Sequence, residues 1–158
     1  MEHNQQTKYD RVEKSFTLHA RKIQKYFAVR VPGNQAQDLT SDTFLVLLNN
    51  IDKVYPGDEL PYLYKVASNL AKNYHKKNKK NSMTIQLLTD HPTVPAPNLD
   101  LYAAISKLPL IEQEILLLQV VDGLPTNTIA EVVDISPNSV RKKLSRTKKK
   151  LQEIYITD

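Results

Sequence analysis

The sequence contains no cysteine and no tryptophan, and only three of its 158 residues are glycine. Without cysteine the chain forms no disulfide and offers no thiolate to a metal, as is common in reducing compartments. It has no glycine-rich phosphate loop and no dinucleotide-binding motif. No run approaches the roughly 18 apolar residues that span a bilayer, and the polar first ten residues do not resemble a signal peptide. We expect no cofactor and no membrane insertion.

No group of residues in the sequence resembles a catalytic or metal-binding set. The four histidines, His3, His19, His75 and His91, lack the spacing of metal ligands. Asp38 and Asp42 are four residues apart and so share a helix face, but no histidine stands in register with them. The sequence therefore predicts no metal site and no enzyme.

Charge is plentiful and unevenly distributed. The chain has 22 basic and 17 acidic residues. Residues 62–80 and 135–152 together contain thirteen of the basic residues and no acidic one. A charged run is most often a solvated surface, but two acid-free runs on predicted helices favour a polyanionic partner such as nucleic acid.

Apolar residues recur at helical spacing through most of the chain. The pattern predicts helices over residues 9–30, 35–50, 60–77, 99–108, 110–122, 126–133 and 137–155, and no strand. Pro92, Pro95 and Pro97 stand close together in a segment without helical period, which is typical of an extended linker. We predict an all-α chain of two small helical domains, at residues 1–78 and 99–158, joined by a flexible linker at 79–98.

The second domain contains a helix-turn-helix pattern. A short helix is followed by a turn at residues 134–136, where Asp134 tolerates a left-handed conformation. The next helix begins with Ser136 as N-cap and Pro137 in its first turn. Val140, Leu144 and Leu151 form one apolar stripe, and the opposite face is polar and basic. This arrangement suits a helix that enters the major groove of DNA.

The polar face of this helix supplies the candidate DNA contacts. Arginine can bond guanine, asparagine can bond adenine, and lysine neutralises phosphates. The candidates are Asn138, Ser139, Arg141, Lys142, Ser145, Arg146 and Lys149. The alternative is an amphipathic surface helix whose lysines are only solvated.

The segment from Leu108 to Leu151 resembles the fourth conserved region of the sigma-70 family of RNA polymerase sigma factors. The motifs that carry the resemblance are Leu108-Pro109, residues 112–118, residues 122–124, residues 129–131 and Ser139-Val140-Arg141. In that family the region binds the −35 promoter element. Several response regulators use similar helices, so this segment alone also fits a stand-alone regulator.

The first domain resembles the second conserved region of the same family. Residues 36–45 are similar to the helix that docks on the clamp helices of the polymerase β′ subunit. Residues 61–74 are similar to the segment that reads and melts the −10 element. The absence of a third domain between the two regions matches the extracytoplasmic-function class.

The resemblance implies a set of contacts for the first domain. Melted DNA is held by cations on phosphates, aromatic faces on bases and amides on base edges. The −10 candidates are Tyr62, Lys65, Asn69, Lys72, Asn73, Lys76 and Lys77; the turn at residues 55–59 corresponds to the family loop that captures a flipped base. The candidate polymerase face comprises Asp38, Leu39, Asp42, Phe44, Leu47 and Leu48, with a plain solvated face as the alternative.

Three classes of function remain to be weighed. A stand-alone helix-turn-helix regulator is disfavoured by the −10-like segment, and a nucleic-acid enzyme by the lack of a catalytic set. We predict a sigma factor that binds core RNA polymerase at the β′ clamp helices and the β flap. It would recognise −35 and −10 elements, assist promoter melting and act in the bacterial cytoplasm at the nucleoid. An anti-sigma partner is common in the class, although no residue reveals one.

Overall fold

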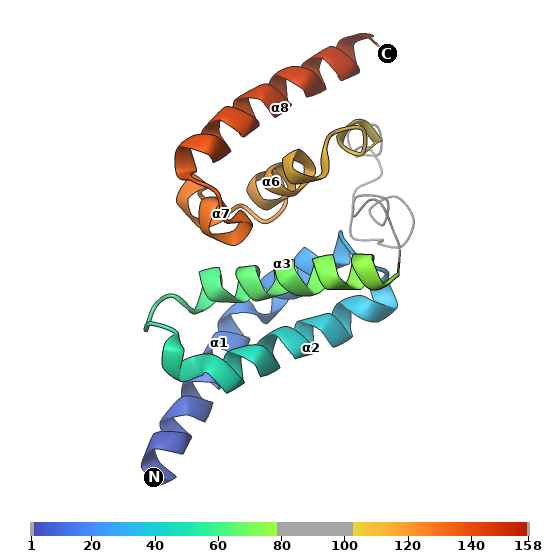
Figure 1. Ribbon diagram of the computed structural model, residues 1–158. Coiled ribbons are helices and arrows are strands. Elements are labelled where there is room, and N and C mark those ends of the chain that lie inside the picture. Colours follow the sequence, from blue (N-terminus) through green and yellow to red (C-terminus); the bar gives the residue numbers. More distant parts are fainter. Residues whose placement is uncertain (1, 79–102, 158) are drawn as a thin grey trace.

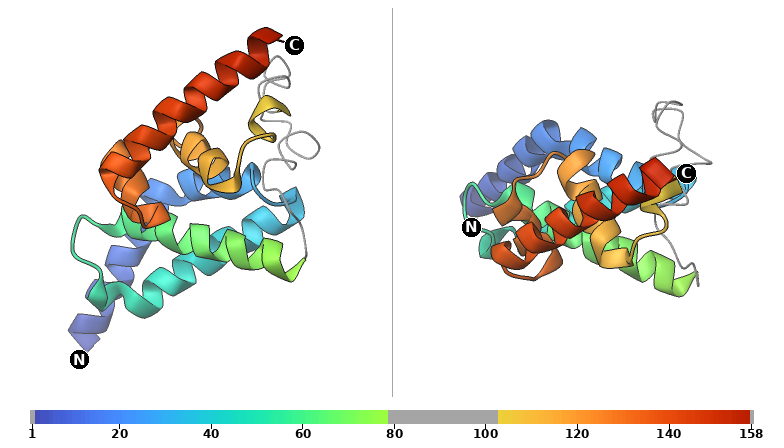
Figure 2. Two further views of the ribbon diagram at one scale, coloured as in Figure 1. Left: turned by 45° about the horizontal axis from the view of Figure 1, so that its top comes forward. Right: turned by 90° about the horizontal axis from the view of Figure 1, so that it is seen from above.

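The computed structural model describes residues 2–78 and 103–157, and within them every regular element is a helix. The first layer holds α1 (Glu2–Ala28), α2 (Gly33–Asn50), a 3₁₀ turn η1 (Ile51–Lys53) and α3 (Glu59–Lys77). The second layer holds α6 (Leu110–Val120), α7 (Thr126–Val133) and α8 (Pro137–Thr157), and lies against the first (Figures 1 and 2). The all-α prediction is confirmed, whereas the predicted linker at 79–98 lies outside the described residues.

The three helices of the first layer pack on one another, and α1 contributes several fully buried side chains. Ile23, Tyr26 and Phe27 follow at helical spacing and are fully buried. The helix ends at Ala28, where Phe27 O accepts hydrogen bonds from the backbone N–H groups of Arg30 and Val31, and Pro32 and Gly33 are the N-cap and first residue of α2. Helix α1 begins at Glu2, whereas the sequence predicts a start at Tyr9. The prediction starts late because the first two turns are polar and contain no apolar residue from which a helical period could be read.

The helix-turn-helix is formed by α7 and α8. Asp134 adopts the left-handed conformation, with φ 60° and ψ 47°, so the turn is kept without glycine. Ser136 Oγ accepts a hydrogen bond from the Ser139 N–H at 3.1 Å, which confirms the predicted N-cap. Val140, Leu144 and Thr147 are buried against the domain, and Lys150 Nζ lies 3.0 Å from Glu112 Oε1 on α6.

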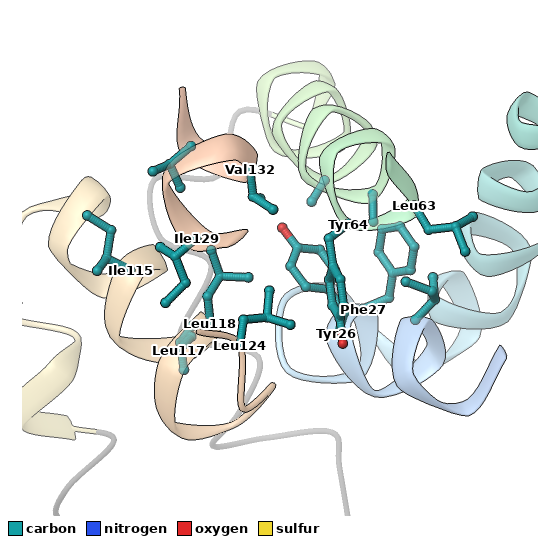
Figure 3. Packing of buried hydrophobic residues seen from close by; sticks show 14 of the residues in the cluster. Tyr26, Phe27, Leu63, Tyr64, Ile115, Leu117, Leu118, Leu124, Ile129 and Val132 are labelled. Carbon is teal, nitrogen blue, oxygen red and sulfur yellow. The ribbon is translucent and has the colours of Figure 1, made fainter. Parts of the chain in front are cut away.

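The two layers share one hydrophobic core. Helix α3 packs against α7, and buried residues of both layers belong to a single cluster. Figure 3 shows Leu124 and Val132 of the second layer facing Tyr26 and Tyr64 of the first. The sequence predicts two domains, but it does not predict this contact between them.

Candidate DNA and polymerase interfaces

The −10 candidates on α3 form an exposed face. Lys65, Asn69, Lys72 and Lys76 succeed one another at intervals of three or four residues and are all exposed. The other candidates are Asn73 and Lys77, which are exposed, and Tyr62, which is half-buried. Because the face opposite to it is buried, α3 is held firmly while its lysines and asparagines face solvent.

A tight turn precedes α3 and presents an aromatic ring. The Asp58 N–H donates to Tyr55 O at 2.9 Å, and Gly57 between them has φ 98°. Proline followed by glycine with positive φ is the signature of a type II turn. The Tyr55 side chain at its first position is 78% exposed, the most exposed large apolar residue in the part of the chain described. The turn thus offers an exposed ring at the N-terminal end of the helix that carries the cationic face.

The −35 candidates lie on the solvent side of α8. Asn138, Arg141, Lys142, Ser145, Arg146 and Lys149 are exposed. Ser139 is half-buried, and its hydroxyl accepts a hydrogen bond from Ser136 Oγ at 2.9 Å. Ser139 therefore belongs to the helix cap as well as to the candidate reading face.

The candidate polymerase face on α2 differs in part from the sequence prediction. Asp38 and Asp42 are exposed, and Leu39 and Leu48 are half-buried, so these four can meet a partner. Phe44 and Leu47 are 5% and 0% exposed, so they support the helix from inside the domain and are corrected to core residues.

Two apolar residues of this face were missed by sequence reasoning. Leu45 is 56% exposed and Phe16 of α1 is 49% exposed, with the Phe16 ring edge-to-face on Phe44 at 5.0 Å. Their signal is weak in the sequence, because Phe16 fits a core position in the helical period and Leu45 stands next to the core residue Phe44 in an apolar run.

A buried cluster of charged groups connects the two layers. The Arg30 side chain is 0% exposed; its Nε donates to Glu114 Oε2 and its Nη2 to Asp122 Oδ2, both at 3.0 Å. Tyr26 Oη donates to Glu114 Oε1 at 2.7 Å, and the Arg30 guanidinium lies 3.6 Å above the Tyr26 ring. One arginine of the first layer is therefore held by two carboxylates of the second.

The groups of this cluster perturb one another electrostatically. Burial alone would lower the pKa of Arg30, but the carboxylates of Glu114 and Asp122 together with Tyr26 raise it. For Asp122, burial and the nearby Glu114 raise the pKa to about 6, against the opposing effect of Arg30. Asp122 Oδ1 also has no hydrogen-bond partner, so the charged form of this carboxylate is poorly accommodated.

Neither metal-binding nor membrane-spanning features are found in the described segments. Among residues 2–78 and 103–157 no group of three or more histidine, aspartate or glutamate residues could hold a metal ion. No helix in these segments has the length and apolarity to cross a membrane.

Comparison with known proteins identifies both halves of the chain. The model of Sigma-70 region 2 matches residues 16–81, and that of Sigma-70, region 4 matches residues 98–151. The ECF RNA polymerase sigma factor EcfG of Rhodopseudomonas palustris is 27% identical over 142 residues, covering 84% of this chain and 78% of that protein.

Solved structures share the fold. CnrH, in complex with the cytosolic domain of CnrY, has a TM-score of 0.70 at 18% identity, covering 93% of this chain and 88% of CnrH. The sigma factor RpoE of Bartonella quintana, in complex with the anti-sigma factor NepR, has a TM-score of 0.70 at 19% identity, covering 92% of this chain and 97% of RpoE. Because the two family models together match most of this chain, in the order of the family, it belongs to the sigma-70 family of RNA polymerase sigma factors, in the extracytoplasmic-function class.

Proposed function

We propose that this chain directs promoter-specific initiation by holding the −10 element on α3 and the −35 element on the solvent face of α8. The observation that carries the proposal is the pair of exposed basic faces, one on each of the matched regions. Six exposed lysine and asparagine residues line α3, and six of the seven −35 candidates on α8 are exposed. Each helix is anchored by a buried apolar side, so its cations can meet phosphates while amides and arginines reach bases.

Core polymerase would be engaged by a separate surface on the first domain. Asp38 and Asp42 supply negative charge, and Leu39, Leu45, Leu48 and Phe16 supply apolar area around it. This acidic and apolar face fits the β′ clamp helices, as the family resemblance implies, and the second domain would meet the β flap. On this proposal the polymerase side of the first domain is acidic and apolar, whereas the two DNA sides are basic.

Both promoter elements can be held at once only if the two domains separate. The elements lie about 25 base pairs apart, which is about 85 Å along B-form DNA. In the chain as described, α3 packs directly against α7, and α8 follows α7 after three residues. Two adjoining helices span only about 20–25 Å across. Binding to polymerase and promoter therefore has to break the contacts of Arg30 with Glu114 and Asp122.

The first experiment asks whether the chain works as a sigma factor. The purified chain is mixed with bacterial core polymerase, tested for co-elution, and then used in run-off transcription on a promoter library. We expect co-elution and initiation from a subset of promoters that core enzyme alone does not use. Failure of both refutes the proposal, because a stand-alone regulator needs no core enzyme to choose its sites.

The second experiment separates base reading from phosphate binding on α8. Arg141→Ala should relax the −35 sequence preference, whereas Lys149→Ala should weaken binding evenly and flatten its salt dependence. Equal losses at every sequence for both variants would contradict the assignment of the reading face.

Three further parts of the proposal rest on membership of the sigma-70 family. The chain would act in the bacterial cytoplasm on nucleoid DNA, where polymerase is found, and it would itself catalyse no step. Because the sigma factor RpoE of Bartonella quintana has been solved in complex with the anti-sigma factor NepR, we propose an anti-sigma factor as a partner here too. Co-purification from the native cell, with core polymerase as the competitor, tests for it.

A further inference from the structure

Arg11 reaches from α1 to the loop that carries Tyr55. Its Nη1 donates to Ile51 O at 2.9 Å, and its Nη2 donates to Val54 O at 2.5 Å and lies 3.2 Å from Glu59 Oε1. Glu59 Oε1 in turn accepts a hydrogen bond from the Gly57 N–H at 2.7 Å. One guanidinium therefore ties together the two ends of the loop at residues 54–58.

These contacts fix the orientation of the turn as well as its shape. Proline and glycine set the local bend, but nothing in a type II turn sets its direction relative to the neighbouring helices. The two carbonyls that Arg11 binds follow α2 directly: Ile51 O, which also accepts the Val54 N–H across η1, and Val54 O in the residue after η1. Val54 O lies in the peptide group that joins Val54 to Tyr55, so holding this oxygen holds the plane from which the Tyr55 side chain departs.

The carboxylate in this network is held in its charged form. Partial burial alone would raise the pKa of Glu59, but hydrogen bonds from Gly57 and Arg11 outweigh it and lower the pKa. The Arg11 and Glu59 side chains are 26% and 14% exposed, so water competes with the pair less than at an open surface. The Tyr55 side chain beyond them faces solvent.

We propose that Arg11 is a positioning residue for the −10 interaction, which holds loop 54–58 ready to receive an unpaired base against the Tyr55 ring. The proposal rests on the proposed function, since it presumes that this loop meets the −10 strand. A loop that is already ordered loses little conformational freedom on binding, and each residue left unordered would weaken binding about tenfold. The pre-formed loop would therefore favour capture of a base over its return to the duplex.

The test measures promoter opening with the full chain in holoenzyme. Arg11→Ala, Tyr55→Ala and the double variant are compared for open-complex formation on a duplex promoter and for base preference across the −10 element. Arg21→Ala is the matched control, because Arg21 is an exposed arginine on the same helix. Glu59→Gln removes the charge with little change in shape and serves as the second variant if Arg11→Ala folds poorly. Thermal unfolding and binding to core polymerase are measured for each.

We expect Arg11→Ala to lower open-complex formation about tenfold and to flatten preference at one −10 position, with core binding unchanged. Glu59→Gln should cause a smaller loss of the same kind, and Arg21→Ala none. If Arg11 acts through the loop, the double variant is no worse than Tyr55→Ala. The proposal would be overturned if the losses of open-complex formation for Arg11→Ala and Tyr55→Ala add in the double variant. It would also be overturned if Arg11→Ala weakens binding to core polymerase as much as it lowers open-complex formation. If the unaltered chain does not initiate at all, the proposed function fails instead.

Discussion

Replacing Arg30 by methionine tests whether its ion pairs hold the two domains together. Methionine keeps much of the length and apolar bulk of arginine but leaves Glu114 and Asp122 buried without a cation. Removing one partner of a buried pair typically costs about 3–5 kcal/mol, because the remaining charge is neither hydrated nor compensated. We therefore expect Arg30→Met to raise the ratio of separated to joined domains by about 150- to 4,000-fold.

The chain is well suited to a distance measurement. It contains no cysteine, so the pair of substitutions Asn49→Cys and Lys148→Cys introduces its only thiols, at exposed positions on α2 and α8. Spin labels or fluorophores on the two sites report the distance between the domains, with and without Arg30→Met. Circular dichroism should remain helical, since each domain keeps its own buried helix faces.

A variant that also removes the two carboxylate charges should restore the contact between the domains. Glu114→Gln and Asp122→Asn, added to Arg30→Met, remove the stranded charges, and we expect the short distance to return in part. Arg21→Ala, on the exposed side of α1, should leave the distance as it is. If Arg30→Met alone keeps the distance distribution of the unaltered chain, the ion pairs of Arg30 do not hold the two domains together.

Three more predictions follow from single residues. In the closed chain the pKa of Asp122 is raised to about 6, first by burial and then by Glu114. Above pH 6 the charged carboxylate therefore opposes closure, and this cost disappears as the pH falls towards the ordinary pKa of 3.8. The distance between the two labels should therefore shorten when the pH is lowered from 7 to 5. The Asp122→Asn chain should already be as closed at pH 7 as the unaltered chain is at pH 5, and its distance should not change over this range. Ser136→Ala should cost about 1 kcal/mol of unfolding free energy, seen as a lower Tm, because it removes the N-cap bond of α8. Asp134→Gly should raise the Tm by a few degrees, since glycine adopts φ 60° without a Cβ penalty, whereas Asp134→Ala should lower it.

The helices and the DNA faces could be read from the sequence because their signals are local. The period of Val140 and Leu144, the Ser136-Pro137 start and the acid-free runs all lie within one or two turns. The structure places these residues as the local rules require, with the apolar stripe of α8 buried and its basic side exposed. The assignment of Phe44 and Leu47 to the polymerase face came instead from the family resemblance, and both side chains are buried in the core, where apolar members of a helical period are expected.

The contact between the domains could not be read in this way. Arg30 and Asp122 are 92 positions apart, and no spacing in the sequence pairs one with the other. Glu114 lies within a motif that indicates the family, yet its buried pairing with Arg30 has no periodic or spacing signal. The Arg11 network is similar: its partners lie 40 to 48 residues away, and two of them are backbone carbonyls that carry no sequence information.

The shared core also bears on how tightly polymerase can bind. A partner that accepts only the separated domains has an apparent affinity reduced by the fraction of chains that are open. If closure is worth about 4 kcal/mol, about one chain in a thousand is open, and the apparent Kd is about a thousandfold weaker than that of a chain held open. Arg30→Met, which leaves two buried carboxylates without their arginine, would then yield the better polymerase binder. The least stable form of this sigma factor would be the one that competes best for core enzyme.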